Sequence, residues 1–528
     1  MKKRILIADS IATDGVEYLR SQPDFDVEVR PGLDESGLGA IVAPFHAVIV
    51  RSATRITAKI MDCATSLQVI GRAGIGVDNI DVARATERGI AVLNTPDANA
   101  TTTAELTLAH IMSLSRSLPQ ADRSVRAGEW KRSDFMGAEL AHKRLGVVGY
   151  GTIGRIVAAR ARALEMQVAA HDPFVTDEVF ASTGVESMDI DELVTVSDYL
   201  TLHCPLNDKT RGILNAARIA SMKPGARLIN CARGGLVDER ALHEALASGR
   251  LGGAALDVFE HEPPAGSPLL KLDNVVVTPH LGASTHEAQA AAGREIARQV
   301  AVYLRTGEPI NAINLPPVGA GEMAKLLPYL TLVRRLGALL GPMVQEPIRQ
   351  LDVTLAGDAA ERDMRSLVIE SLVGLLGMHM SVPVNRVNAR HVAAQQGIAL
   401  VESRREQHPD YHGTVSLAAH HGNRTTTVEG TLFDRRHPRL VRINDYEIEA
   451  VLDGHLLLTR HRDQPGVIAA ISSLLAGRGI NISRMQLGIV NGSDKAVAVI
   501  GVSTPLDAEL LRQLAAVPAI SKVMQVSL

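Results

Sequence analysis

The sequence is poor in aromatic residues and in cysteine. Aromatic residues make up 3% of the 528 positions, so the hydrophobic cores must consist mainly of Ala, Val, Leu and Ile. The three cysteines, Cys63, Cys204 and Cys231, are far apart and show no C-x-x-C spacing, which argues against a disulfide framework and is typical of the reduced cytosol. We expect each of them to be a small buried residue.

Strong net charge and long apolar runs are also missing. A net charge of −3 gives no electrostatic reason to expect binding to nucleic acid or to a membrane surface. No segment approaches the length of a membrane span, and the first apolar run stops at Asp9, too early for a signal peptide. We therefore expect a cytoplasmic protein with small ligands, and 528 residues predict three or four domains.

One stretch, residues 144–172, carries the clearest pattern in the chain. A β-branched apolar run at 145–148 predicts a buried strand, and Gly149, Gly151 and Gly154 follow it with G-x-G-x-x-G spacing. A helical period and a second strand come next. In such a loop one glycine permits a tight turn, one lets the backbone approach a pyrophosphate, and one lets helix and strand pack closely.

The residues around these glycines fit a bound dinucleotide. Thr152 and Ile153 open the predicted helix, whose free N–H groups and dipole favour a diphosphate. Asp172 stands where a carboxylate accepts hydrogen bonds from an adenosine ribose. Pro173 and Phe174 follow it, so no arginine offsets the repulsion between that carboxylate and a 2′-phosphate. The pattern predicts NAD rather than NADP; the alternative is a glycine-rich loop without a ligand.

Short apolar strands alternate with helices on both sides of this stretch. The alternation predicts parallel α/β sheets, of which the first has no phosphate loop of its own. In an open α/β sheet, ligands bind beyond the carboxyl ends of the strands. Four residues follow predicted strands and are expected to meet in one crevice: Arg233, Asp257, Glu262 and His280.

Three of these residues fit hydride transfer from a secondary alcohol to a nicotinamide. Arg233 can grip a substrate carboxylate with two hydrogen bonds. His280 can take the hydroxyl proton, because histidine titrates near neutral pH. Glu262, if it pairs with His280, would favour the imidazolium and raise its pKa. Taken singly, each residue also fits a structural role as a surface arginine, a histidine satisfied in the core or a solvated glutamate.

Taken together, four motifs resemble the successive signatures of the D-2-hydroxyacid dehydrogenase family. They are GYGTIG at 149–154, NCARGGLVDE at 230–239, DVFEHEPP at 257–264 and TPHLGAST at 278–285. The resemblance covers residues 1–315 and implies NAD as cofactor, Arg233 as the carboxylate binder, His280 as the proton donor or acceptor, and Glu262 as the acid that tunes it. It adds these cofactor contacts: Cys231, Ala232, Arg233, Asp257, His280, Gly282 and Ala283.

Within that family, the chain is most similar to the long-form D-3-phosphoglycerate dehydrogenases. The segments VRSAT at 50–54, RAGIGVDNID at 72–81 and EWKR at 129–132 resemble the substrate side of those enzymes. A phosphorylated hydroxy acid needs cations besides Arg233; the alternative for each cation is an exposed charge without a ligand. Trp130 is expected to be a packing anchor. The implied substrate residues are Arg51, Ser52, Gly74, Asn99, Lys131 and Arg132, the last two from the same or a neighbouring subunit.

The C-terminal segment predicts a βαββαβ unit with an Asn491-Gly492 turn between two strands. RDQPGVI at 462–468 and GINI at 479–482 resemble an ACT domain, a small-molecule sensor of amino-acid metabolism. The resemblance implies that two such domains pair and bind L-serine between them; the alternative is a module that only dimerises. The implied effector contacts are Asp463, Asn481 and His461.

The preceding region, residues 319–452, shows no catalytic signature, and the resemblance implies an intervening domain. Helices are expected near 325–340 and 361–376, followed by strands that include LVRINDYEIEA at 440–450. A basic cluster fits a solvated face better than a site for a phosphorylated effector: Arg435, Arg436, Arg439 and Arg442. Irregularly spaced histidines without carboxylate or cysteine partners predict no metal site: His408, His412, His420 and His421.

The expected architecture is α/β, with a Rossmann-type NAD domain inserted in a flavodoxin-like substrate-binding domain, then an α+β intervening domain and a βαββαβ ACT domain. A helix from Thr101, capped by a threonine, and a helix at 284–305 should join the first two domains. Residues 316–319 read as a linker. We expect the substrate-binding domain (below, the N-terminal domain) at 1–98 and 286–315, the NAD domain at 99–285, the intervening domain at 319–452 and the ACT domain at 455–528.

The resemblance implies a specific activity. It is the NAD-dependent oxidation of 3-phospho-D-glycerate (3-phosphoglycerate) to 3-phosphooxypyruvate, the first step of L-serine biosynthesis, with feedback inhibition by L-serine in a homotetramer. One alternative is another dehydrogenase on this scaffold, acting on glycerate, 2-hydroxyglutarate or lactate. The other is an NAD-sensing interaction protein, against which the intact set of Arg233, Glu262 and His280 argues. No metal, nucleic-acid or membrane partner is expected.

Overall fold

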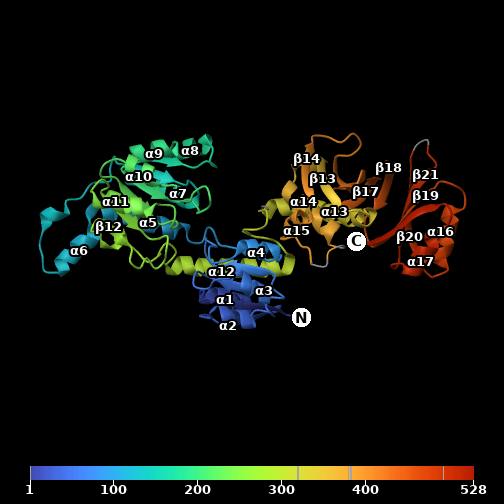
Figure 1. Cartoon of the computed structure of the whole chain (residues 1–528), viewed down its shortest axis with the longest axis horizontal. Coiled ribbons are helices and arrows are strands. Elements are labelled where there is room, and N and C mark those ends of the chain that lie inside the picture. The colour runs from blue at the N-terminus through green and yellow to red at the C-terminus, as the bar shows by residue number, and fades with distance from the viewer. Residues whose placement is uncertain (1, 318–319, 378–379, 381–382, 491–492) are drawn as a thin grey trace.

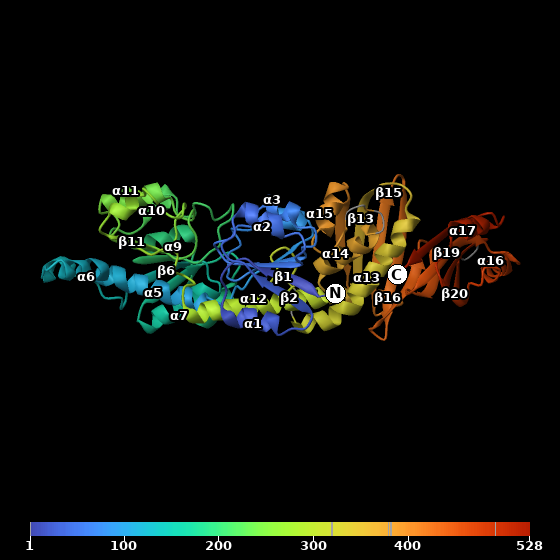
Figure 2. The same ribbon diagram turned by 90° about the horizontal axis from the view of Figure 1, so that it is seen from below.

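Four domains follow one another along an elongated molecule. The computed structural model describes residues 2–317, 320–377, 380, 383–490 and 493–528. Figures 1 and 2 show the NAD domain at one end, then the N-terminal domain, the intervening domain and, at the other end, the ACT domain. The predicted linker at 316–319 and the Asn491-Gly492 turn lie wholly or partly outside the described residues.

The N-terminal domain is a parallel five-stranded sheet with the strand order β2-β1-β3-β4-β5. This is the flavodoxin-like order that was predicted. Strand β3 is buried at every position, as expected for a parallel strand covered on both faces. The elements are β1 (Lys3–Ile7), α1 (Thr13–Arg20), β2 (Phe25–Val29), α2 (Glu35–Ile41), β3 (Ala47–Val50), α3 (Ala58–Cys63), β4 (Val69–Arg72), α4 (Val82–Glu87) and β5 (Ala91–Leu93).

The NAD domain is a parallel seven-stranded sheet with the order β12-β11-β10-β9-β6-β7-β8. The chain order reverses beside β6, and at such a switch point an open sheet leaves a crevice at its carboxyl edge. The strands are β6 (Arg144–Val148), β7 (Gln167–His171), β8 (Glu186–Ser187), β9 (Tyr199–Leu202), β10 (Arg227–Asn230), β11 (Gly253–Leu256) and β12 (Val275–Val277). The α-helices are α6 (Leu118–Arg126), α7 (Thr152–Ala163), α8 (Asp177–Thr183), α9 (Ile190–Val196), α10 (Ala216–Ser221) and α11 (Glu239–Ala247).

Two long helices link these domains. Helix α5 (Ala100–Arg116) enters the NAD domain, and α12 (His286–Thr306) returns to pack on α1, where a Cβ on Gly15 would lie 2.4 Å from the carbonyl oxygen of Gly293. The predicted threonine cap of α5 is wrong: the cap residue is Asn99, without a side-chain cap hydrogen bond. Thr103 Oγ1 instead donates to the carbonyl oxygens of Asn99 and Gly282, which ties the helix to a later loop.

The intervening domain packs helices on a six-stranded sheet of order β14-β13-β15-β16-β17-β18. The stretch predicted as strand at 440–450 is a hairpin, because the chain turns at Asn444 with a φ of 48°. The elements are α13 (Ala320–Met343), β13 (Ile348–Gly357), α14 (Met364–Leu376), α15 (Ala389–Gln395), β14 (Ala399–Arg405), β15 (Gly413–His421), β16 (Arg424–Phe433), β17 (His437–Ile443) and β18 (Tyr446–Val451).

The ACT domain has the predicted βαββαβ order and the strand order β20-β21-β19-β22. One face of its sheet packs on its own helices, and the other packs on the intervening domain: Leu456, Leu458 and Val499 share one hydrophobic cluster with Leu336 of α13. The elements are β19 (His455–Arg462), α16 (Val467–Ala476), β20 (Ile482–Ile489), β21 (Lys495–Val502), α17 (Ala508–Ala515) and β22 (Ile520–Ser527).

Two expectations change in the fold, one for the cysteines and one for the histidines. Cys63 is exposed at the end of α3, so its predicted burial is wrong; Cys204 is half-buried and Cys231 is buried. Two histidines do gain carboxylate partners, at 3.4 Å between His408 and Glu429 and at 2.8 Å between His420 and Asp352. They belong to separate pairs, and within the described residues no group of three or more metal-ligating side chains gathers.

Two of the four arginines in the basic cluster of the intervening domain lie in ion pairs. Arg442 lies 3.6 Å from Glu429 and 3.5 Å from Glu447, and the exposed Arg435 lies 3.7 Å from Asp358. These pairs fit the solvated face that was favoured. Among the described helices, none has the length and apolar character needed to cross a membrane.

Candidate active site

The glycine-rich loop joins β6 to α7 at the carboxyl edge of the sheet. Gly149 has a φ of 94°, and a Cβ there would lie 2.6 Å from the carbonyl carbon of His203. A Cβ on Gly154 would lie 2.2 Å from the carbonyl oxygen of Gly149, so Gly154 permits the close packing of helix on strand. No described atom lies within 4 Å of a Cβ placed on Gly151. Packing therefore explains two of the glycines, and the third leaves open space at the helix terminus, where a diphosphate was predicted.

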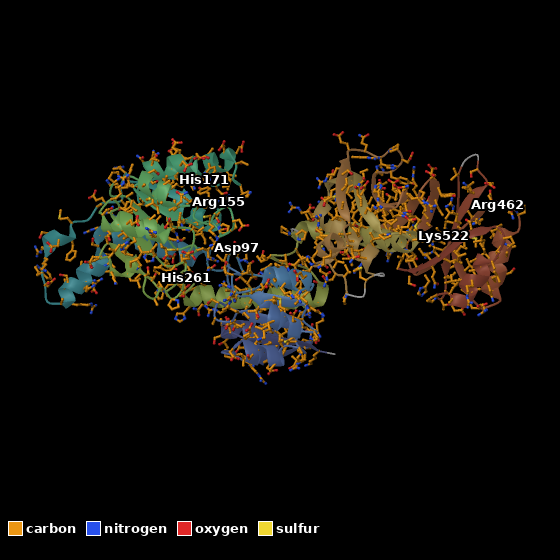
Figure 3. All side chains as sticks on the ribbon, in the orientation of Figure 1. Asp97, Arg155, His171, His261, Arg462 and Lys522 are labelled. Carbon is orange, nitrogen blue, oxygen red and sulfur yellow. The ribbon has the colours of Figure 1, made fainter. Side chains whose placement is uncertain are left out.

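Asp172 directly follows β7 and lies beside the glycine-rich loop. Its Oδ2 accepts a hydrogen bond from the backbone N–H of Tyr150 at 2.8 Å, and its Oδ1 accepts one from Phe174 at 2.9 Å. Each carboxylate oxygen keeps a second lone pair, which is what a ribose hydroxyl requires. Figure 3 labels His171, the last residue of β7, and Arg155 of α7 on this domain.

A cleft of about 400 Å³ lies between the NAD domain and the N-terminal domain. Figure 3 labels Asp97, shortly before α5, where the two domains meet. The cleft is lined from one side by the 75–78 loop and from the other by residues that follow the strands of the NAD domain. The predicted site residues that line it are Asn99, Ile153, Cys231, Ala232, Arg233, His280, Gly282 and Ala283.

His280 and Glu262 form a hydrogen-bonded pair at this cleft. The distance between His280 Nδ1 and Glu262 Oε2 is 2.8 Å, and the other carboxylate oxygen, Oε1, accepts the backbone N–H of Phe259 at 3.1 Å. His280 has a φ of 55°, an uncommon backbone conformation that aims its ring. Because Nδ1 is bound to the carboxylate, Nε2 is the nitrogen left for a substrate hydroxyl.

Arg233 reaches across the cleft toward the N-terminal domain. Its Nε donates to Asp78 Oδ2 at 3.1 Å, and its Nη1 donates to the carbonyl oxygen of Ala232 at 2.7 Å. A Cβ on Gly76 would lie 1.9 Å from Nη2, so that glycine leaves room for the guanidinium. Asn230 fixes the loop by donating to the carbonyl oxygen of Arg233 at 2.9 Å. These contacts thus fix the position of the guanidinium before a substrate binds, and Asp78 is its counter-ion.

Asp257 is buried and bonded within the protein. It accepts Thr278 Oγ1 at 2.6 Å and the backbone N–H groups of Leu281 at 2.6 Å and Gly282 at 2.9 Å. Its own carbonyl oxygen accepts the N–H of His280 at 2.9 Å. These bonds hold the loop that carries the catalytic candidate, so the geometry gives Asp257 a supporting position behind the cleft wall.

Two cleft residues, Arg72 and His203, were not singled out from the sequence. Burial, and then the charge of Arg233, lower the pKa of Arg72 to about 10, so it stays protonated at neutral pH. A Cβ on Gly74 would lie 1.7 Å from Arg72 Nη1, which gives this predicted substrate residue its role: it makes room for a second guanidinium. Burial lowers the pKa of His203 to about 3, which keeps its ring neutral. Both residues stand at or just after the end of a strand, so the rule that found Arg233 applies to them too.

Four predicted substrate side chains do not line the cleft: those of Arg51 and Ser52, which follow β3, and those of Lys131 and Arg132, which follow α6. The backbone N–H of Arg51 donates to Asp9 Oδ2 at 2.6 Å, and neither Arg51 nor Ser52 lines the cleft. Lys131 pairs with Glu129 at 2.9 Å and lines a different pocket beside α6.

The EWKR segment follows α6 and lies apart from the cleft. In Figure 1, α6 lies at the end of the NAD domain that points away from the N-terminal domain. The guanidinium of Arg132 lies 5.6 Å from the ring centroid of Trp130, whose side chain is 73% exposed. Trp130 is thus not a packing anchor within its own chain, because this segment extends from the domain instead of folding onto it.

The predicted effector residues lie at opposite ends of the ACT sheet. Strand β21 pairs with both neighbours, so that Val502 is level with His455 and Ile482, while Lys495 is level with Arg462. Asn481 precedes Ile482 and Asp463 follows Arg462, so the length of β19, about 24 Å, separates them. One small ligand can touch both only if they come from two chains. His461 is buried, and burial lowers its pKa.

Family models match three successive parts of the chain. Residues 108–282 match the D-isomer specific 2-hydroxyacid dehydrogenase NAD-binding domain, 325–444 the D-3-phosphoglycerate dehydrogenase intervening domain and 455–519 the ACT domain. The D-3-phosphoglycerate dehydrogenase of Synechocystis sp. is 39% identical over 99% of this chain and 95% of its own length. The chain belongs to the D-3-phosphoglycerate dehydrogenase family. The enzyme of that name from Methanocaldococcus jannaschii is 38% identical over 99% of this chain and 100% of its own length.

Solved structures cover a shorter part of the chain. The TT0316 protein of Thermus thermophilus is 35% identical, with a TM-score of 0.55 over 59% of this chain and 99% of its own. D-lactate dehydrogenase from Aquifex aeolicus, complexed with NAD and lactic acid, is 28% identical, with a TM-score of 0.54 over 59% of this chain and 100% of its own. The matches confirm the resemblance found in the motifs, the predicted fold class and NAD as the cofactor.

Proposed function

We propose that this member of the family oxidises the 2-hydroxyl of 3-phosphoglycerate to the ketone of 3-phosphooxypyruvate, with NAD as hydride acceptor, as the first step of L-serine biosynthesis. The observation that carries the proposal is that Arg233 and His280 line one cleft, beside the loop that fits a dinucleotide, while Glu262 bonds to His280 from the adjoining pocket. Arg72 adds a second cation in that cleft, as a substrate with two anionic groups requires.

The residues divide the chemistry among them. The guanidinium of Arg233 holds the substrate carboxylate and orients C2, with Nη groups that Asp78 does not occupy. His280 takes the hydroxyl proton at Nε2 while its Nδ1–H stays bonded to Glu262, whose negative charge stabilises the imidazolium. NAD, when bound, accepts the hydride that leaves C2. In the reverse direction the same imidazolium returns the proton to the carbonyl oxygen.

The substrate phosphate is the group that distinguishes this activity from other 2-hydroxyacid oxidations. We propose that Arg72 faces it from the cleft, that Arg51 reaches it from the end of the neighbouring strand β3, and that Lys131 and Arg132 reach it from a second copy. The exposed Trp130 and the 85% exposed Met136 beside them support a contact between the EWKR segment and a second copy. Large apolar side chains gathered on a projecting segment are typical of a surface that binds a partner.

A substrate panel tests the reaction. NADH formation is measured with 3-phosphoglycerate, glycerate, 2-hydroxyglutarate and lactate, and we expect the phosphorylated acid to have the highest kcat/KM. If glycerate is turned over equally well, the phosphate assignment is wrong and a different hydroxyacid specificity holds. Binding of NAD without turnover of any hydroxy acid would favour the sensing protein instead.

Complementation tests whether Lys131 acts in the active site of a second copy. Chains carrying Lys131→Ala are co-expressed with chains carrying Arg233→Ala. A mixed dimer then has one active site with Arg233 from one chain and Lys131 from the other, so activity above that of either variant alone is expected. Activity no higher than the sum of the two separate variants would mean that Lys131 does not act across the subunit boundary.

We further propose that L-serine inhibits the enzyme by binding between two ACT domains, in a cytoplasmic homotetramer built from NAD-domain and ACT-domain contacts. The separation of Asp463 and Asn481 along β19 supports a site shared by two chains. Asp463→Ala and Asn481→Ala should each abolish inhibition, and their co-expression should restore part of it, because one of the two shared sites is then intact. Absence of any serine effect on the parent protein would refute the regulatory proposal.

A further inference from the structure

A second cationic pocket lies far from the cleft, where three domains meet. It has a volume of about 670 Å³ and is bounded by the end of α12, by α13 and α14, and by Ser527 and Leu528 of the ACT domain. Its charged side chains are three arginines and one glutamate: Arg334, Arg335, Arg386 and Glu370. Three guanidiniums against one carboxylate give the side chains of the lining an excess of positive charge.

Close helix packing builds this cluster. A Cβ on Gly337 of α13 would lie 2.2 Å from the carbonyl oxygen of Ser371, and a Cβ on Gly374 of α14 would lie 2.0 Å from that of Arg334. The two glycines thus let the helix backbones touch. This contact places Arg334 of α13 against Glu370 of α14.

Glu370 is the fixed centre of the cluster. Its side chain is only 6% exposed, and its two oxygens lie 3.2 Å from Arg334 Nη1 and 3.2 Å from Arg386 Nε. Burial raises the pKa of Glu370, and the two guanidiniums oppose that shift. Neither Glu370 Oε2 nor Arg386 Nε makes a hydrogen bond to a described atom. The two ions therefore attract each other electrostatically, without an aligned hydrogen bond between them.

The arginines retain donors for a ligand. Each guanidinium has five N–H groups in a planar fork, and Glu370 engages one nitrogen of Arg334 and one of Arg386. Arg335 uses one nitrogen for the carbonyl oxygen of Leu452, in the segment that leads to the ACT domain. Paired forks of this kind match the oxygens of a phosphate group.

We propose that this pocket binds a small dianion of the phosphate or phosphate-monoester class and thereby fastens the N-terminal domain to the intervening and ACT domains. The three guanidiniums supply the positive charge and the N–H donors that such a ligand requires. The site is separate from the active-site cleft, and its existence does not depend on the reaction proposed above.

Calorimetry on the full chain tests the proposal. Inorganic phosphate is titrated at constant ionic strength into the parent, Arg334→Gln and the control Arg365→Gln, which changes an exposed arginine of α14 outside the pocket. Binding of phosphate in the active-site cleft is common to all three. We expect Arg334→Gln to lose one charged hydrogen bond and to weaken the additional binding event about tenfold, with no change in Arg365→Gln.

A second variant, which neutralises the carboxylate, separates a binding site from a structural cluster. Glu370→Gln removes the only carboxylate side chain of the pocket while keeping its shape, so phosphate should bind more tightly and should raise the Tm more than in the parent. A structural cluster predicts the opposite, since Glu370→Gln would only lose ion pairs. Equal phosphate affinity in the parent, Arg334→Gln and Glu370→Gln would overturn the proposal.

Discussion

The most discriminating single substitution is Glu262→Gln, because glutamine keeps the shape of the side chain and supplies only one acceptor oxygen. In the parent, Oε1 accepts the N–H of Phe259 at 3.1 Å while Oε2 accepts His280 Nδ1–H at 2.8 Å. Glutamine must give up one of these bonds. If its NH₂ group faces His280, Nδ1 becomes the acceptor and the ring proton moves to Nε2, which then cannot take the hydroxyl proton.

The expected loss follows from that bond. A hydrogen bond to a charged group contributes about 1.5–3 kcal/mol, and the partial exposure of both side chains, 48% for His280 and 38% for Glu262, reduces this to about 1–2 kcal/mol. The kcat of NAD-dependent oxidation should therefore fall about fivefold to thirtyfold, with little change in KM, since Glu262 acts through His280 and not on the substrate. The matched control is Glu260→Gln, an exposed neighbour. A Glu262→Gln enzyme with the parental kcat would refute the pairing as part of the chemistry.

Two further predictions concern chemistry and packing. Burial raises the pKa of Cys204 to about 11 and that of Cys231 to about 12, so their reactive thiolates form only at strongly alkaline pH. Iodoacetamide at mildly alkaline pH should therefore label only the exposed Cys63, and mass spectrometry that finds a second label would contradict this. Gly154→Ala should destabilise the protein by about 1–3 kcal/mol in thermal melts, because its Cβ meets the carbonyl oxygen of Gly149. Gly151→Ala, which meets no described atom, should keep the parental Tm but weaken NAD binding; equal stability of the two variants would be the contrary result.

Local patterns carried the prediction of the first two domains. The apolar run at 145–148, the glycine spacing and Asp172 each act within a few residues, and the structure puts them on one edge of a parallel sheet. The rule that ligands bind beyond strand ends then placed Arg233 and His280 at one cleft. These features are predictable because backbone geometry and short-range packing set them.

Pairings across the domains could not be predicted in this way. The bond between Arg233 and Asp78 joins residues 155 positions apart on two domains, and nothing in the local sequence around Asp78 distinguishes it from a surface charge. Arg72 is a different case: it ends β4, so the strand-end rule that found Arg233 could have found it as well. The opposite placement of Asp463 and Asn481 follows from strand register, which depends on how β19, β20 and β21 pair and not on the motifs themselves.

The way the four domains are joined has a consequence for regulation. The ACT sheet buries Leu456, Leu458 and Val499 in the same cluster as helix α13, so the ACT and intervening domains share a core and should move as one body. The contacts between the intervening and N-terminal domains are smaller: Asn385 donates to the carbonyl oxygen of Gly89 at 2.8 Å, and Val387 packs into the N-terminal core. A ligand bound at the ACT domain can therefore change the cleft only if the ACT and intervening domains move together against the N-terminal domain. The cationic pocket lies at the junction where that movement would occur.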